Sequence, residues 1–334
     1  MKKCDQRQRI RNARLRRKRT LAHEREKQRR LHKHGAIVDK NAINRKRQRN
    51  QFVLMTVPSC FDFISNAENL LVFFNDLRKN LEKNPVRLDM SKVTEINSSA
   101  LLYLISLVQD MKMKKKTFVI HGNLPNDKKC CEVMEQSGFF KYAKRTDHAR
   151  MEDKGNTLQI SSSGKMDPHK VSQCCEFVRN KLEVDRLGTK WLYSVICEII
   201  LNATHHALSH WKEEFDSWYM FAKYQDNYVE LVILDTGLGI PNTVKKNFLE
   251  KIRLWPDSDD ASLIQSALNG DFRTQTKQGY RGKGLPEIFN YYANGVIKNI
   301  VIISKHGYIN GREKKNLTGK FNGTLFALRI EKHE

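Results

Sequence analysis

Three short segments in the second half of the chain carry side chains that can bind a nucleotide together. They are Glu-Ile-Ile-Leu-Asn at residues 198–202, Asp-Thr-Gly-Leu-Gly-Ile-Pro at residues 235–241 and Arg-Gly-Lys-Gly-Leu at residues 281–285. Each pattern is common by itself. Their order and spacing are more specific, with 37 residues from Glu198 to Asp235 and 47 from Asp235 to Gly282.

The first segment places a carboxylate and an amide on one face of a predicted helix. Glu198 and Asn202 are four residues apart, so their side chains lie one above the other. Their neighbours are apolar, and leaving a buried polar group unpaired costs about 1–3 kcal/mol, so the pair needs a partner. An Asn oxygen suits Mg²⁺, and a carboxylate one turn earlier can orient or deprotonate a nucleophile. A purely structural role for Glu198 is the alternative.

The second segment is suited to a purine base. Asp235 ends a predicted strand, where its carboxylate can accept a hydrogen bond from an exocyclic amino group such as that of adenine. Gly237 and Gly239 permit backbone angles and a close approach that a Cβ would prevent. The simpler interpretation is that these residues only end a hairpin.

The third segment is suited to phosphates. Gly282 and Gly284 can present N–H groups at the start of a helix from about residue 286, and Lys283 adds positive charge.

The remaining elements predicted for this half are helices at 169–182 and 189–210 and two hairpins. The first hairpin has strands 218–224 and 228–234 and turns at 225–227. The last hairpin has strands 301–305 and 324–330, with Gly323 and Thr324 at its turn.

Together these segments resemble the Bergerat-fold, histidine kinase-like ATPase domain, and most closely that of anti-sigma factor serine kinases. The resemblance covers roughly residues 169–331 and implies an α/β sandwich, a mixed sheet with helices on one face, at residues 169–334. It implies ATP and Mg²⁺ as ligands, with Asn202 holding the metal and Glu198 as the candidate catalytic base. It also implies Asp235 as the adenine contact. The glycines at 237, 239, 282 and 284, Lys283 and Thr324 complete the implied nucleotide contacts.

The first half of the chain predicts a smaller α/β domain at residues 51–150. Expected strands at 52–57, 85–89 and 117–120 alternate with expected helices at 67–81, 98–113 and 128–137, which is the pattern of a small α/β fold. Ser98 and Ser99 are expected to cap the middle helix. A linker is expected at residues 151–168, where Gly, Ser and charged residues mix.

Residues 88–101 of this half resemble the signature of STAS domains, the fold of anti-sigma factor antagonists. In that family a serine at a helix start is phosphorylated by a partner kinase, and the matching positions are Ser98 and Ser99. A phosphate there would meet free N–H groups and the helix dipole. Asn97 and Ala100 replace the Asp and Gly of the family pattern, and a plain N-cap is the alternative role for the turn.

Charge is concentrated at the beginning of the chain. The net charge is +23, and residues 1–50 hold 20 Lys and Arg against four Asp and Glu. This basic arm is expected to be disordered or helical and can bind nucleic acid or another polyanion; a solubility tail is the alternative. Seven cysteines without a disulfide or zinc pattern, no secretory signal and no long apolar run favour a cytoplasmic protein without a membrane span.

The two resemblances together imply an ATP-binding regulatory protein of the partner-switching type. Its expected reaction is that of an Mg²⁺-dependent serine kinase or ATPase, which transfers the γ-phosphate to Ser99 or to a serine of a STAS-like or sigma-regulatory partner. The alternative is a nucleotide-gated interaction module without phosphoryl transfer, which its basic arm could bring to nucleic acid.

Overall fold

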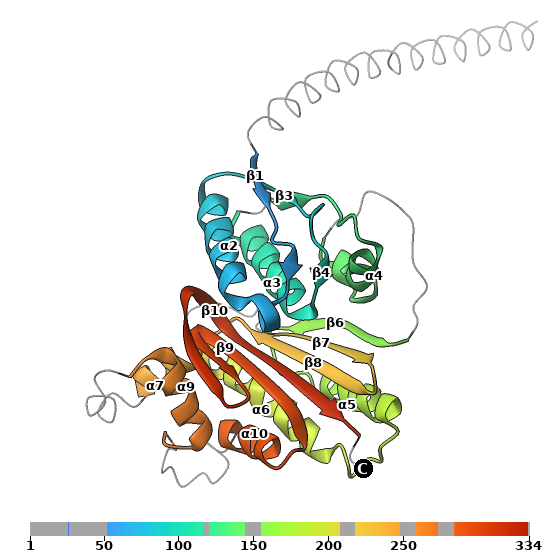
Figure 1. Ribbon diagram of the computed structural model, residues 1–334, viewed down its shortest axis with the longest axis vertical. Helices are drawn as coiled ribbons and strands as arrows, with labels where there is room; N and C mark the ends of the chain where they lie inside the picture. Colours follow the sequence, from blue (N-terminus) through green and yellow to red (C-terminus); the bar gives the residue numbers. More distant parts are fainter. Residues whose placement is uncertain are drawn as a thin grey trace, which may run out of the picture. The chain divides into compact units, whose positions relative to one another are not determined.

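The protein has a mixed α/β fold, seen here in a computed structural model (Figure 1). The structure describes Glu26 and residues 52–115, 120–143, 155–207, 218–247, 258–272 and 284–332. The chain divides into two compact units, residues 1–53 and 54–334. Apart from Glu26, the predicted basic arm lies outside the described residues, so its expected state stays a prediction.

The first half of the larger unit combines short parallel strands with long helices. Strands β1, β3 and β5 form one sheet in that order, and β2 pairs with β4; the pairs β3–β5 and β2–β4 are parallel. The elements are β1 (Val53–Thr56), β2 (Cys60–Phe61), α2 (Phe63–Lys83), β3 (Val86–Asp89), β4 (Glu95–Ile96), α3 (Ser98–Lys115), β5 (Ile120–Gly122), α4 (Lys128–Gln136) and the 3₁₀ turn η1 (Phe139–Lys141).

Helix α3 begins differently from the sequence prediction. The cap is Asn97, whose Oδ1 accepts a hydrogen bond from the N–H of Ser99 at 2.8 Å. Asn is as good an N-cap as Ser, because its side-chain oxygen reaches the same free N–H groups. Ser98 and Ser99 are therefore the first residues of the helix, and both are buried, with exposed fractions of 3% and 0%.

The second half is built around one sheet of five strands in the order β6-β7-β8-β10-β9. All of its pairs are antiparallel, so the expected mixed sheet is wrong in this respect. The elements are β6 (Thr157–Ser163), α5 (Pro168–Leu182), α6 (Lys190–Ala207), β7 (Trp218–Gln225), β8 (Tyr228–Asp235), α7 (Ile240–Asn247), α9 (Asp260–Asn269), α10 (Gly284–Ala293), β9 (Ile297–Asn310) and β10 (Glu313–Glu331).

The antiparallel order follows from the tight turns in this half. Asp226 and Asn227 have φ values of 47° and 70°, which is the left-handed geometry that joins β7 to β8 as a two-residue hairpin. This turn lies where the sequence predicted it. The second hairpin is much longer than predicted, because β9 and β10 continue to a turn at Gly311, where φ is 59°. Gly323 and Thr324 consequently lie inside β10 and not at a turn.

The sheet is covered on both faces. One face packs against α5, α6 and α10 (Figure 1), and alternate strand residues such as Leu231 and Ile233 point into that core. The intervening residues Val232 and Leu234 are also fully buried, because α2 and α3 pack against β7, β8 and β10. The two halves of the larger unit therefore share a core.

The predicted linker contains a strand. Within residues 151–168, β6 occupies Thr157–Ser163 and pairs with β7 at the edge of the sheet. An edge strand bonds on one side only, so a polar segment with three serines can form it without burying every side chain. In the described part of the chain, no helix is both long and apolar enough to cross a membrane.

Candidate functional site

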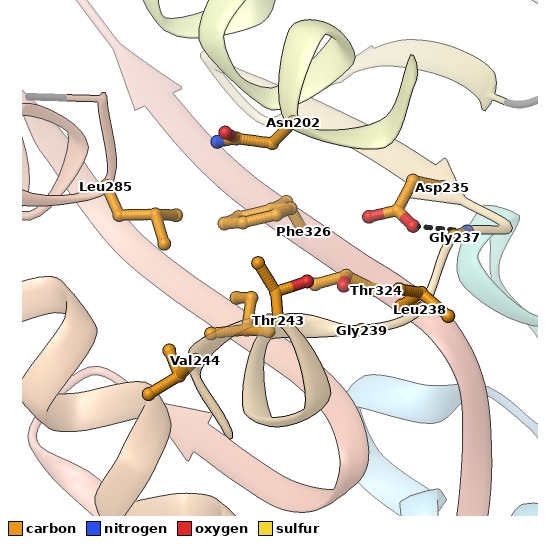
Figure 2. Close-up of a pocket in the computed structure, with 11 residues that line it drawn as sticks. Asn202, Asp235, Gly237, Leu238, Gly239, Thr243, Val244, Leu285, Thr324 and Phe326 are labelled. Atoms are coloured by element: carbon orange, nitrogen blue, oxygen red, sulfur yellow. Dashed lines mark hydrogen bonds between the residues drawn. The ribbon is translucent and has the colours of Figure 1, made fainter. Parts of the chain in front are cut away.

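One pocket gathers residues from both ends of the second half. The empty space within it is about 480 Å³, part of which is open to solvent. Figure 2 shows side chains from α6, β8, α10 and β10 approaching the same space, closed on one side by the start of α7. The lining residues are Asn202, Asp235, Gly237, Leu238, Gly239, Ile240, Thr243, Val244, Leu285, Thr324 and Phe326.

Asp235 is the buried acid of this pocket. Its exposed fraction is 6%, and its Oδ1 accepts a hydrogen bond from the N–H of Gly237 at 2.7 Å. Burial raises the pKa of Asp235 to about 6, although the Gly237 N–H, the Thr324 hydroxyl and the positive charge of Lys305 act in the opposite direction. The carboxylate is thus held in a fixed orientation with acceptor capacity left for a ligand.

The glycine loop after Asp235 is anchored to the neighbouring hairpin by Ser304. The Ser304 hydroxyl accepts a hydrogen bond from the N–H of Ile240 and donates one to the carbonyl of Gly323, each at 3.0 Å. Gly239 has φ of +84°, and a Cβ there would lie 2.8 Å from the Ser304 oxygen. Glycine is therefore required at 239 by both backbone angle and space.

Gly323 brings β10 against the end of β8. Its φ is +97°, and a Cβ there would collide with the carbonyl oxygen of Asp235. Thr324 pairs directly with Asp235 across the strands, and its hydroxyl lies 3.2 Å from that of Ser304. This contact explains why Thr324 lines the pocket although it is far from the other motifs in sequence.

Glu198 lies beside the pocket and is absent from its lining. The Glu198 side chain packs against Gly284, the first residue of α10, where a Cβ would lie 2.9 Å from Cδ of the carboxylate. Partial burial raises the pKa of Glu198, and the nearby carboxylate of Glu287 raises it further. Asn202, one turn later on α6, is exposed and reaches the pocket. The two polar groups of the helix thus face different surroundings.

The candidate phosphoacceptors lie away from this pocket. The Ser99 hydroxyl accepts a hydrogen bond from the N–H of Phe63 and donates one to Oδ1 of Asp62, each at 3.1 Å. The Ser98 hydroxyl lies 3.4 Å from Oε2 of Glu230 on β8. Neither serine is among the residues that line the cavity.

The pocket therefore unites Asn202, Asp235, Gly237, Gly239 and Thr324 of the residues selected from the sequence. Gly282 and Lys283 lie outside the described residues.

No protein-family model matches the chain, and no curated protein matches it.

Ser304 and Lys305 on β9 were not predicted from the sequence. The only sequence signal for them is a polar pair at the end of the apolar run 300–303.

Proposed function

We propose that this chain is an ATP-binding regulatory protein of the partner-switching type, in which a Bergerat-type domain follows a STAS-like domain. The observation that carries the proposal is the convergence of Asn202, Asp235 and the loop of Gly237 and Gly239 on one pocket. The sequence predicts that Asn202 binds a metal ion, that Asp235 contacts the base and that the two glycines let the backbone approach a ligand closely. A nucleotide is the ligand that needs all three.

The base is bound at the inner end of the pocket. Asp235 accepts a hydrogen bond from the adenine amino group, since a carboxylate offers about four acceptor sites and the N–H of Gly237 and the groups of Thr324 do not fill them all. An apolar wall suits the flat ring, as in most small-molecule sites. It consists of Leu238, Ile240, Val244, Leu285 and Phe326.

The phosphates and the metal are bound at the outer end. Asn202 is exposed there and offers a neutral oxygen, which fits Mg²⁺ because this ion takes few protein ligands and keeps phosphate and water oxygens. The bound ion would neutralise phosphate charge. The N-terminus of α10 at Gly284 is suited to an anion as well.

The reaction is transfer of the γ-phosphate to a serine hydroxyl of a separate protein. The serine oxygen bonds to the γ-phosphorus, the bond to the β–γ bridging oxygen breaks, ADP leaves, and Glu198 takes the hydroxyl proton. A partly buried carboxylate with a raised pKa is suited to this role. Ser98 and Ser99 are poor acceptors, because both are buried and hydrogen-bonded within the fold.

A nucleotide-gated interaction module without phosphoryl transfer is the second candidate. It is favoured by the hairpin of β9 and β10, which runs from the pocket to the first half of the unit. At one place Ser304 holds the glycine loop, and further along the Tyr308 hydroxyl donates a hydrogen bond to the carbonyl of Ile64 at 2.8 Å. A ligand that moves the loop would thereby act on α2.

Isothermal titration with ATP and Mg²⁺ tests the binding proposal. We expect micromolar to millimolar affinity for ATP in the wild type and a loss of this affinity in Asp235→Asn. Equal affinity in the two proteins would remove the pocket assignment.

Incubation with γ-labelled ATP and candidate STAS-like partners, followed by mass spectrometry, separates the two functions. Partner label that disappears in Glu198→Gln while ATP still binds supports the kinase. Binding without label, with altered exchange of α2 amides, supports the module.

A further inference from the structure

Lys305 on β9 is a lysine in an unusual position. Its exposed fraction is 8%, whereas lysine is almost never buried without a partner. Its ammonium forms no hydrogen bond or ion pair with the described residues. A buried cation of this kind needs a compensating negative charge nearby, or it would be driven to lose its proton.

The local backbone directs this side chain beneath the glycine loop. Lys305 has φ of 55°, a left-handed conformation that is uncommon for residues other than glycine. The pairing register between β9 and β10 shifts here: Ser304 is opposite Thr324, whereas the next residue, Lys305, is opposite Phe321. The Cε atom of Lys305 consequently lies 2.9 Å from the position that a Cβ of Gly239 would take.

We infer that Lys305 is a positioning residue of the nucleotide site, whose ammonium charge balances the buried carboxylate of Asp235 and keeps it ionised for the base. The inference rests on the proposed function and deepens it. Lys305 touches no ligand in this arrangement; it acts through Asp235 and through the glycine loop that its methylene stem supports.

The charges around the pair favour this assignment. Burial lowers the pKa of Lys305, as does the exposed Lys320 on β10, whereas Asp235 and Asp260 raise it. Asp260 is already engaged, because Lys245 lies 2.9 Å from its Oδ1 and the N–H of His306 donates to its Oδ2. Among the described residues, Asp235 is left as the carboxylate that needs Lys305, and the positive charge of Lys305 lowers the pKa of Asp235 and so favours its ionised form.

Ionisation of Asp235 matters for the chemistry of recognition. An amino group donates hydrogen bonds, so it needs an acceptor oxygen. A protonated Asp235 carries a hydrogen on one oxygen and, with the other bonded to Gly237, cannot accept well. Because burial raises the pKa of Asp235 to about 6, affinity should be complete above that pH and lost as the pH falls through it. Without Lys305 the pKa rises, and the loss begins at higher pH.

The test is the pH profile of ADP affinity for the full chain without Mg²⁺, measured by titration between pH 5 and 8.5. Wild type and Lys305→Arg should lose affinity near the pKa of Asp235, and Lys305→Met should lose it at clearly higher pH. Lys320→Met is the matched control; because Lys320 is exposed, its profile should stay close to wild type. An unchanged midpoint in folded Lys305→Met overturns the inference, and failure of wild type to bind ADP instead overturns the proposed function.

A measurement on the wild type covers the case in which Lys305→Met does not fold. Carbon-13 resonances of the Asp235 carboxyl and the Lys305 Cε are followed by nuclear magnetic resonance over the full pH range. Deprotonation of Lys305 should appear as a second step in the Asp235 signal. Two independent titrations without this second step would contradict the inference.

Discussion

The Ser98 hydroxyl lies 3.4 Å from Oε2 of Glu230, which joins the first turn of α3 to the middle of β8. Asn97 strengthens this junction, since its Nδ2 lies 3.2 Å from both carboxylate oxygens of Glu230. Burial raises the pKa of Glu230, and the two polar partners lower it. The start of α3 thus faces a partly buried acid on the sheet face opposite α5, α6 and α10.

Ser98→Asp should destabilise the protein, because a second carboxylate would be forced against Glu230. We expect a loss of about 1–3 kcal/mol in the free energy of unfolding, measured by urea denaturation at pH 7.5. Ser98→Ala should cost less, since it removes two long hydrogen bonds, to Asn97 and Glu230, without adding a charge. In the background of Glu230→Gln, Ser98→Asp should be much milder; an equal cost in both backgrounds would show that the two groups do not interact.

Asp235→Asn should stabilise the fold while removing nucleotide binding. The folded pKa of Asp235, about 6, lies above its ordinary value of 3.8, so keeping it ionised opposes folding at neutral pH. This difference corresponds to at most about 3 kcal/mol, present in full above pH 6 and absent once the pH falls below 3.8. Thermal melts of both proteins at pH 7.5 and pH 4 check this. A gain that does not shrink in acid would contradict the titration as its cause.

Gly239→Ala should destabilise the protein and weaken ADP binding. The new Cβ would meet Ser304 at 2.8 Å in a backbone conformation with φ of +84°. Gly295→Ala is a matched control, because Gly295 has φ of +73° but nothing within 4 Å of the new Cβ. Both changes place an alanine in a left-handed backbone conformation, which costs about 1 kcal/mol or more in stability. Only Gly239→Ala should cost more than this and reduce affinity, as shown by denaturation and titration; equal costs would mean that Ser304 yields freely.

Deletion of residues 1–50 should flatten the salt dependence of any binding to nucleic acid, because this segment carries 20 Lys and Arg. Fluorescence anisotropy with a labelled RNA between 50 and 300 mM salt measures the slope of log affinity against log salt. ADP affinity of the shortened protein is the control and should not change. A slope that survives the deletion would place the contact in the folded part of the chain.

The sequence was sufficient for the parts of the site that lie within single elements. Asp235 at the end of β8 follows from the alternation of its strand and the glycines after it, and the α6 spacing of Glu198 and Asn202 follows from helical geometry. Ser304 and Lys305 could not be found this way. Their roles depend on the register between β9 and β10, which shifts at this point. The sequence of the residues at the shift gives no signal of it.

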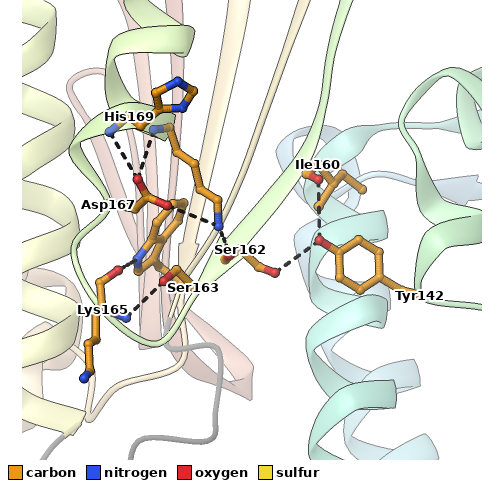
Figure 3. Close-up of polar contacts among 9 residues, drawn as sticks. Tyr142, Ile160, Ser162, Ser163, Lys165, Asp167 and His169 are labelled. Atoms are coloured by element: carbon orange, nitrogen blue, oxygen red, sulfur yellow. Dashed lines mark hydrogen bonds and ion pairs between the residues drawn. The ribbon is translucent and has the colours of Figure 1, made fainter.

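The segment before α5 shows a second limit of sequence patterns. Three serines and nearby charges predicted a linker, but their polar groups bond across elements (Figure 3). The Tyr142 hydroxyl lies 3.1 Å from that of Ser162, and Lys170 donates to the carbonyl of Ser162 at 2.6 Å. The indole of Trp218 donates to the carbonyl of Lys165 at 3.0 Å. Such partners are distant in sequence, so composition alone cannot distinguish a polar edge strand from a connection.

The sheet with two covered faces has a practical consequence for how the chain can be divided. Residues 169–334 expressed alone would lack both β6 and the helices that cover Val232 and Leu234. Water would then reach a broad apolar surface, and the fragment would be expected to aggregate. Evolution could lengthen the surface loops of such a protein, but could not exchange its first half for another module without redesigning the surface beneath it.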